Sequence, residues 1–130
     1  MLLVAFNRPE LVEKRLSEIS GLEIPCLYIT VDGSKDGKGK KVTTEINKII
    51  EKYENKIPIR KNIREFNVGL ATNVTEGINW VLNDYEDCLI IEDDIAVNDF
   101  FYYSAVETWV KNRKKFATIG GFGDRKSTRL

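Results

Sequence analysis

The stretch LLVAFNRPELVEKRLSEIS, residues 2–20, places a short apolar run directly before an amphipathic one. Its first part, residues 2–6, is continuously apolar, which is typical of a buried strand. Asn7-Arg8-Pro9 ends this run, and proline is favoured in the first turn of a helix. The apolar residues that follow share one helical face, and Gly21 supplies a stop; they are Leu11, Val12, Leu16 and Ile19. The stretch therefore predicts a strand followed by a helix.

The same alternation continues along the rest of the chain. It predicts strands at 26–31, 57–63, 88–92 and 116–121, and helices at 42–53, at 67–85 and after Asn98 or Asp99, which can cap the last one. In the helix at 67–85 the residues expected on one apolar stripe are Leu70, Val74, Ile78, Val81 and Leu82. Such alternation predicts an α/β fold, with a mostly parallel, Rossmann-like sheet and helices on both faces.

The composition is that of an ordinary globular chain. Of the 130 residues, 42% are hydrophobic and 31% are charged, which is enough for one compact domain with a core. No segment approaches the ~20 apolar residues of a membrane span, and the start of the chain does not resemble a signal peptide. We therefore expect no transmembrane segment and a cytoplasmic protein, working in solution or at the surface of the inner membrane. Histidine is absent, which excludes histidine bases, Ser-His triads and histidine-ligated metals.

Charge is unevenly distributed. Residues 1–110 contain 13 Lys/Arg and 19 Asp/Glu, whereas residues 111–130 contain 7 and 1. The acidic body argues against a nucleic-acid groove, so we expect no nucleic-acid partner. The final DRKSTRL, residues 124–130, has no periodicity, and we expect it to be an unstructured or foreign tail after a single domain of residues 1–123.

Polar and charged residues follow each predicted strand: Asn7-Arg8, Asp32-Gly33, Asn67-Val68-Gly69 and Glu92-Asp93-Asp94. In a parallel sheet these positions share one edge, where ligands bind. Mg²⁺ and Mn²⁺ take hard oxygen ligands, usually one or two carboxylates together with phosphate oxygens. The sequence therefore predicts one cleft in which a divalent metal and its diphosphate compensate the three acids. Arg8 could then pair with a phosphate oxygen, and Asp32 could accept hydrogen bonds from a base or sugar.

Each feature also has a purely structural interpretation. An acidic triplet after a strand is equally consistent with a solvated loop that starts the next helix. VDGS, residues 31–34, is an ordinary turn sequence, Arg8 can be a surface residue, and Gly69 can serve only to free the backbone for a turn. Only the convergence of these features on one edge favours a site.

Four segments together carry a resemblance to a known family: VAFNRPELVEKRL (4–16), LYITVDGS (27–34), NVGLATNVTEGI (67–78) and LIIEDDIAVNDFFYY (89–103). In order and spacing they resemble nucleotide-sugar-dependent glycosyltransferases of the GT-A fold, in particular bacterial family 2-type sugar transferases and the N-acetylglucosaminyltransferase I group. The resemblance covers residues 2–123. It implies a metal-dependent transferase with a nucleotide-sugar-binding domain, a UDP-sugar as the expected donor, and a glycan or lipid-linked acceptor.

The resemblance also implies roles for individual residues. Glu92-Asp93-Asp94 would be the acidic DxD-like motif, with Asp94 as the Mn²⁺ or Mg²⁺ ligand and the other two acids facing the ribose and the donor sugar. Asp32 would lie against the uracil and Arg8 near the diphosphate. The segment that lines the nucleotide pocket would include Asn67, Gly69 and Asn73.

The implied reaction is transfer with inversion, in which an acceptor hydroxyl attacks the sugar opposite the leaving diphosphate. The resemblance places the general base and most of the acceptor site beyond TIGGF, residues 118–122, so we expect the chain to be the donor-binding part of a truncated transferase. Two alternatives stay open. A nucleotidyltransferase also places carboxylates and Mg²⁺ at strand ends, although FNRPEL (6–11) offers no glycine-rich phosphate loop, and a non-catalytic α/β interaction domain would use the acids only to start a helix.

Overall fold

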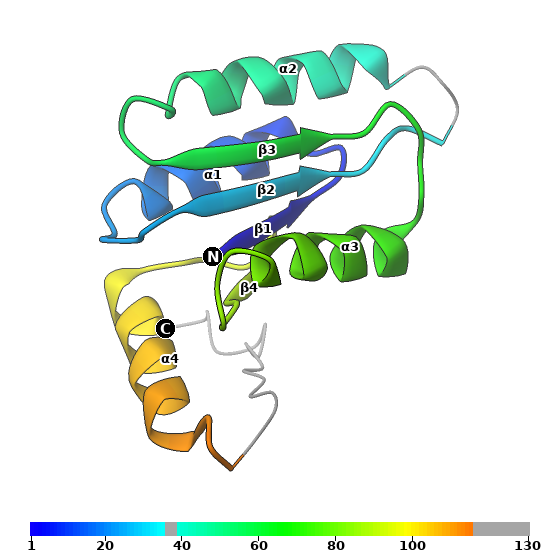
Figure 1. Cartoon of the computed structure of the whole chain (residues 1–130). Helices are drawn as coiled ribbons and strands as arrows, with labels where there is room; N and C mark the ends of the chain where they lie inside the picture. The colour runs from blue at the N-terminus through cyan, green and yellow to red at the C-terminus, as the bar shows by residue number, and fades with distance from the viewer. Residues whose placement is uncertain (36–38, 116–130) are drawn as a thin grey trace, which may run out of the picture. The chain divides into compact units, whose positions relative to one another are not determined.

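The computed structural model describes residues 1–35 and 39–115, and it confirms the predicted alternation of strands and helices (Figure 1). The elements are, in chain order, β1 (Leu2–Ala5), α1 (Pro9–Ile19), β2 (Leu27–Val31), α2 (Lys40–Glu51), β3 (Ile59–Ile63), α3 (Leu70–Leu82), β4 (Ile90–Glu92) and α4 (Asp99–Asn112). The chain divides into two compact units, Met1–Ala96 and a second one that begins at Val97. The strand predicted at 116–121, the domain end at 123 and the tail at 124–130 lie outside the described residues.

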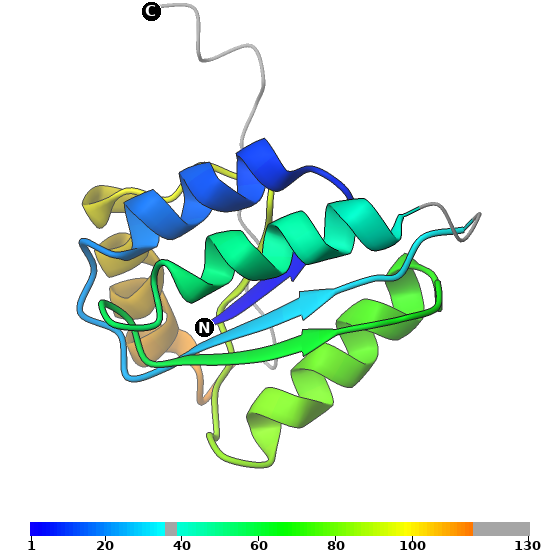
Figure 2. The same cartoon turned by 90° about the horizontal axis from the view of Figure 1, so that it is seen from above.

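The sheet belongs to the first unit and consists of four parallel strands in the order β3-β2-β1-β4. In the centre, Leu3 of β1 lies between Ile29 of β2 and Ile91 of β4. Helices α1 and α2 lie on one face and α3 lies on the other (Figure 2). The predicted α/β class, with a parallel sheet covered on both faces, is thus confirmed.

The core forms because β1 and β2 are buried along their whole length. Side chains alternate between the two faces of a strand. Leu2, Val4 and Tyr28 face α3 and pack with its Val81. The intervening residues face α1 and α2, whose buried apolar side chains are Val12, Leu16, Ile19, Ile46, Ile49 and Ile50. Burial on both faces explains why these strands read as continuous apolar runs.

Helix α3 is rotated relative to the predicted apolar stripe. Its buried residues are Asn73, Gly77 and Val81, whereas Leu70 and Leu82 are 63% and 46% exposed. The prediction was therefore wrong for these two leucines. Gly77 permits this orientation, because an added Cβ there would lie only 3.0 Å from Leu2 Cδ2 and 3.2 Å from Thr30 Cγ2. Because Gly77 has no side chain, the backbone of α3 lies close to β1 and β2 at this residue.

Replacing Gly77 with valine is expected to lower the free energy of unfolding by about 1–3 kcal/mol, because three extra carbons must enter a packed interface. Chemical denaturation measures this effect directly. Ala71→Val is the matched control, since it adds a valine to an exposed position of the same helix and is expected to change stability by less than about 0.5 kcal/mol. Equal effects of the two substitutions would contradict the close approach at Gly77.

Helix α4 begins as the sequence predicts. The side chain of Asn98 accepts a hydrogen bond from the Phe101 N–H at 2.8 Å, so Asn98 is the N-cap. None of the α4 residues is buried. Within the described part of the chain, no helix combines the length and the apolar character that crossing a bilayer requires.

Candidate functional site

The carboxyl ends of the four strands meet at one edge of the sheet, as the sequence predicts. The strand order decides which side chains meet there. Because β2 lies beside β3, Asp32 contacts the β3–α3 loop, and because β1 lies beside β4, Arg8 contacts the acids. By their contacts the predicted residues form two groups. We call them the Asp32 cluster (Asp32, Gly33, Asn67, Val68, Gly69) and the Arg8 cluster (Arg8, Asp93, Asp94).

In the Asp32 cluster one carboxylate holds a whole loop. Oδ1 of Asp32 accepts hydrogen bonds from the N–H groups of Gly33 and Val68, both at 2.9 Å. Oδ2 accepts from the Gly69 N–H and from Asn67 Nδ2, both at 3.0 Å. The residue is only 5% exposed. Protein donors thus occupy both oxygens that were expected to receive a base or sugar, and in this structure Asp32 fixes the loop before α3.

Both glycines of the Asp32 cluster are required by the backbone. A Cβ on Gly33 would overlap the backbone of Phe66, so the β3–α3 loop can pass the residues after β2 only at a glycine. Gly69 is the N-cap of α3, with φ 85° and ψ 154°, a backbone conformation that residues other than glycine rarely adopt. The turn that the sequence predicts at Gly69 is confirmed, and its N–H is one of the donors to Asp32.

In the Arg8 cluster a single guanidinium faces two carboxylates. Arg8 Nη2 donates to Oδ1 of Asp93, and Arg8 Nη1 lies 3.6 Å from Oδ2 of Asp94. The side chain of Asp93 is 2% exposed, that of Asp94 is 30% exposed and that of Arg8 is 42% exposed. Burial raises the pKa of the Asp93 carboxyl, and the charge of Arg8 works against this shift. Arg8 is therefore the counter-ion of the acidic turn in this structure.

Glu92 does not join the Arg8 cluster. It is the last residue of β4 and pairs in register with Val4, whose side chain faces α3. Asp93 follows it directly, as the first residue of the turn after β4. Glu92 is exposed, whereas Asp93 is buried. The expectation that three acids share one cleft is therefore corrected: two carboxylates gather at Arg8, and Glu92 lies on the α3 face of the sheet.

The carboxylates of the Arg8 cluster could bind a metal ion only if phosphate oxygens or water supplied its other ligands. In residues 1–35 and 39–115 no group of three or more acidic, cysteine or histidine side chains is arranged to hold a metal ion. Among these described residues Oδ2 of Asp93 is buried and has no partner at hydrogen-bond geometry, although the nearby Phe6 N–H counteracts the burial that raises the pKa of this carboxyl. Asp94, beside it, is more accessible. Mg²⁺ is commonly bound by one or two carboxylates plus substrate phosphates. Asp93 and Asp94 fit that mode and do not form a complete protein cage.

Asn73 lies inside the first unit. It is fully buried, and its Oδ1 accepts hydrogen bonds from Thr30 Oγ1 at 2.6 Å and from Arg64 Nε at 2.9 Å. Arg64 in turn pairs with Glu76 at 2.6 Å. The structure thus places Asn73 between α3 and the sheet, where it ties the end of β3 to the helix. Sequence reasoning missed Thr30 and Arg64, because a single polar residue in a strand carries no signal of its partner.

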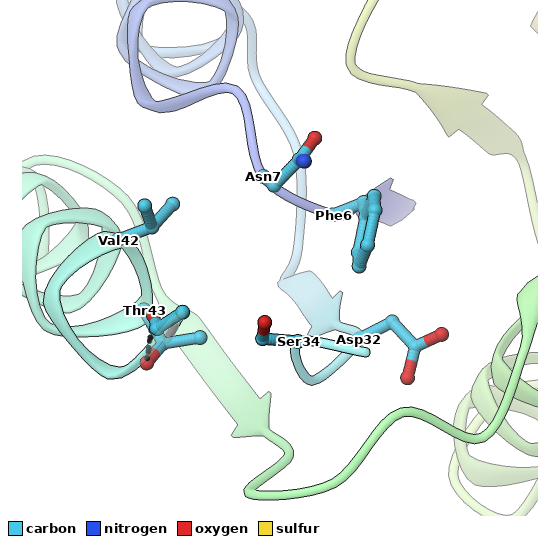
Figure 3. Close-up of a pocket in the computed structure, with 7 residues that line it drawn as sticks. Phe6, Asn7, Asp32, Ser34, Val42 and Thr43 are labelled. Atoms are coloured by element: carbon cyan, nitrogen blue, oxygen red, sulfur yellow. Dashed lines mark hydrogen bonds between the residues drawn. The ribbon is translucent and has the colours of Figure 1, made fainter. Parts of the chain in front are cut away.

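A cavity of about 230 Å³ lies at the ends of β1 and β2 (Figure 3). Its walls come from the β1–α1 turn, from the residues after β2 and from the first turn of α2; the lining residues are Phe6, Asn7, Asp32, Ser34, Gly39, Val42 and Thr43. In Figure 3 the carboxylate of Asp32 points away from Val42 and Thr43. Of these residues only Asp32 was predicted as a binding residue, because the others show no chemical pattern along the sequence.

The cavity and the Arg8 cluster are joined by one short turn. Phe6 and Asn7 line the cavity, and the next residue, Arg8, contacts Asp93 and Asp94. The β1–α1 turn therefore contributes both to the wall of the cavity and to the Arg8 cluster. Comparison with protein-family models, curated proteins and solved structures finds no match to this chain.

Proposed function

We propose that the chain binds a nucleoside diphosphate sugar, with a UDP-sugar as the expected donor, together with Mn²⁺ or Mg²⁺. The function is that of a metal-dependent, inverting glycosyltransferase that acts on a hydroxyl of a glycan or a lipid-linked acceptor. The observation that carries the proposal is the β1–α1 turn, which joins a cavity to a pair of carboxylates at the carboxyl edge of a parallel sheet.

The size and polarity of the two parts support a nucleotide. The cavity of about 230 Å³ is below the usual range for a drug-sized ligand and suits a single ring system. Phe6 and Val42 offer apolar contact, and Asn7 and Ser34 offer polar groups that could recognise a base. The diphosphate would then lie beyond Asn7, toward Arg8 and the acids. The cavity would hold the base alone, and the sugar of the donor would lie outside it.

Burial and orientation favour Asp94 as the metal ligand. Glu92 points to the α3 face, and Asp93 is enclosed at 2% exposure, whereas Asp94 keeps 30% of its side chain exposed. When bound, the metal would neutralise the charge that develops on the leaving diphosphate. The protein residues would bind and orient the donor: Arg8 would lie near the diphosphate, and the Asp32 cluster would hold the loop beside the base.

Calorimetric titration of UDP into the folded chain, with and without Mn²⁺, tests the proposal. We expect binding with Mn²⁺ and at least about tenfold weaker binding after chelation with EDTA, because the metal supplies the charge that phosphates need beside two carboxylates. Equal binding with and without Mn²⁺ would contradict the metal site. Absence of UDP binding by a chain with native circular dichroism would contradict the donor site.

A further inference from the structure

Arg8 occupies the position in which a cation would neutralise the two acids. It is the N-cap residue of α1, but its side chain makes no capping hydrogen bond there. Instead the guanidinium faces Asp93 and Asp94. In the absence of ligand, any divalent cation that approaches these carboxylates must therefore compete with a charge that the protein already carries.

The two sides of this contact differ in freedom to move. Asp93 is enclosed, and its backbone N–H is fixed by a hydrogen bond to the Val4 carbonyl at 3.1 Å. Arg8 is 42% exposed on a long side chain. A buried carboxylate needs a compensating charge, but that charge need not come from the same group in every state. Exposure therefore makes Arg8, rather than Asp93, the partner that solvent can receive when the contact opens.

We infer that Arg8 is an exchangeable counter-cation: it neutralises Asp93 and Asp94 in the ligand-free protein and transfers to the diphosphate when a divalent cation takes its place. The inference rests on the proposed function and adds that Arg8 changes its partner when the metal and the diphosphate bind. Guanidinium binds phosphate in the same forked geometry as carboxylate, so Arg8 gains a new partner only when the diphosphate arrives. The metal alone offers it none.

Two opposite effects follow from this exchange. Mn²⁺ alone must displace Arg8 without giving it a new partner, so Arg8 weakens the binding of the free metal. With the diphosphate present, Arg8 holds the phosphate, so it strengthens the binding of the nucleotide. Metal and nucleotide should therefore bind with positive coupling, and each should raise the affinity for the other by the same factor. A residue that merely stabilises the fold would not act in both directions.

The test measures Mn²⁺ binding without nucleotide, from the electron paramagnetic resonance signal of free Mn²⁺, in wild type, Arg8→Met and Lys52→Met. Lys52→Met is the matched control, because it removes the same charge from an exposed pair with Glu13 at 3.2 Å. We expect Arg8→Met to bind Mn²⁺ about tenfold more tightly than wild type, and to bind UDP in the presence of Mn²⁺ about tenfold more weakly. The control should change neither affinity by more than about twofold.

Arg8→Lys keeps the experiment decisive if Arg8→Met does not fold. A lysine ammonium lacks the fork that faces both carboxylates, so we expect Mn²⁺ alone to bind about threefold more tightly than to wild type. Unchanged or weaker Mn²⁺ binding in the folded Arg8 variant would overturn the exchange. If UDP nevertheless binds to wild type in the presence of Mn²⁺, the proposed donor site is supported although the exchange of Arg8 is wrong. If Mn²⁺ binding rises but UDP does not bind wild type, Arg8 and the metal compete, and the proposed function is wrong.

Discussion

Replacing Asp32 with asparagine is expected to lower the free energy of unfolding by about 2–4 kcal/mol, because buried N–H donors would lose their acceptor. The carboxylate accepts four hydrogen bonds, two on each oxygen. An amide keeps one oxygen and presents an NH₂ group in place of the other. Whichever way it turns, at least one backbone N–H of the loop then faces another donor.

Rotation of the Asn67 amide cannot repair this loss completely. If Asn67 turned its oxygen toward the new NH₂ group, it would give up the hydrogen bond from its Nδ2 to the Gly33 carbonyl at 2.9 Å. The Gly69 N–H would still lack its acceptor. The expected cost therefore exceeds that of one ordinary hydrogen bond.

Urea denaturation of wild type, Asp32→Asn and Asp94→Asn measures the effect. Asp94→Asn makes the same chemical change at the same edge of the sheet, but its side chain is 30% exposed, and we expect a change below about 0.5 kcal/mol. A stable Asp32→Asn protein that bound UDP less tightly would instead support the role that the family resemblance implies, in which Asp32 contacts the base.

The sequence predicts the elements well because each leaves a local signal. Strands buried on both faces are apolar without interruption, as in residues 2–6, and the turns contain glycine, proline or asparagine. The positions of Asn98 and Gly69 also follow from local rules, because an N-cap and a positive φ each require particular residue types. Each of these features depends on residues that are close together in the chain.

Partners across the sheet leave no such signal. Asp32 and Arg8 were both predicted to face a ligand, whereas the structure gives each of them protein partners more than thirty residues away. The strand order creates these pairs, and alternation alone does not fix that order. The orientation of Glu92 was, however, open to prediction, because consecutive strand residues point to opposite faces.

Replacing Asp94 with asparagine is expected to weaken the Mn²⁺-dependent binding of UDP by about 10–100-fold or more while the fold is kept. An amide oxygen is a neutral and poorer ligand for a hard cation. Asp93 cannot replace Asp94, because its side chain is enclosed at 2% exposure. Glu92 lies within β4 and pairs in register with Val4, whose side chain faces α3. The proposed site therefore depends on one accessible carboxylate.

Glu86→Gln is the matched control for Asp94→Asn. It removes one negative charge from an exposed residue of the α3–β4 connection, at the opposite edge of the sheet. Calorimetric titration of UDP with Mn²⁺ should give the wild-type affinity for Glu86→Gln, since a distant exposed charge is screened by salt. Equal affinities of wild type and a folded Asp94→Asn would show that the metal does not use the acidic turn. The acids would then serve only to pair with Arg8 and to lead the chain out of β4, as in the interaction-domain alternative.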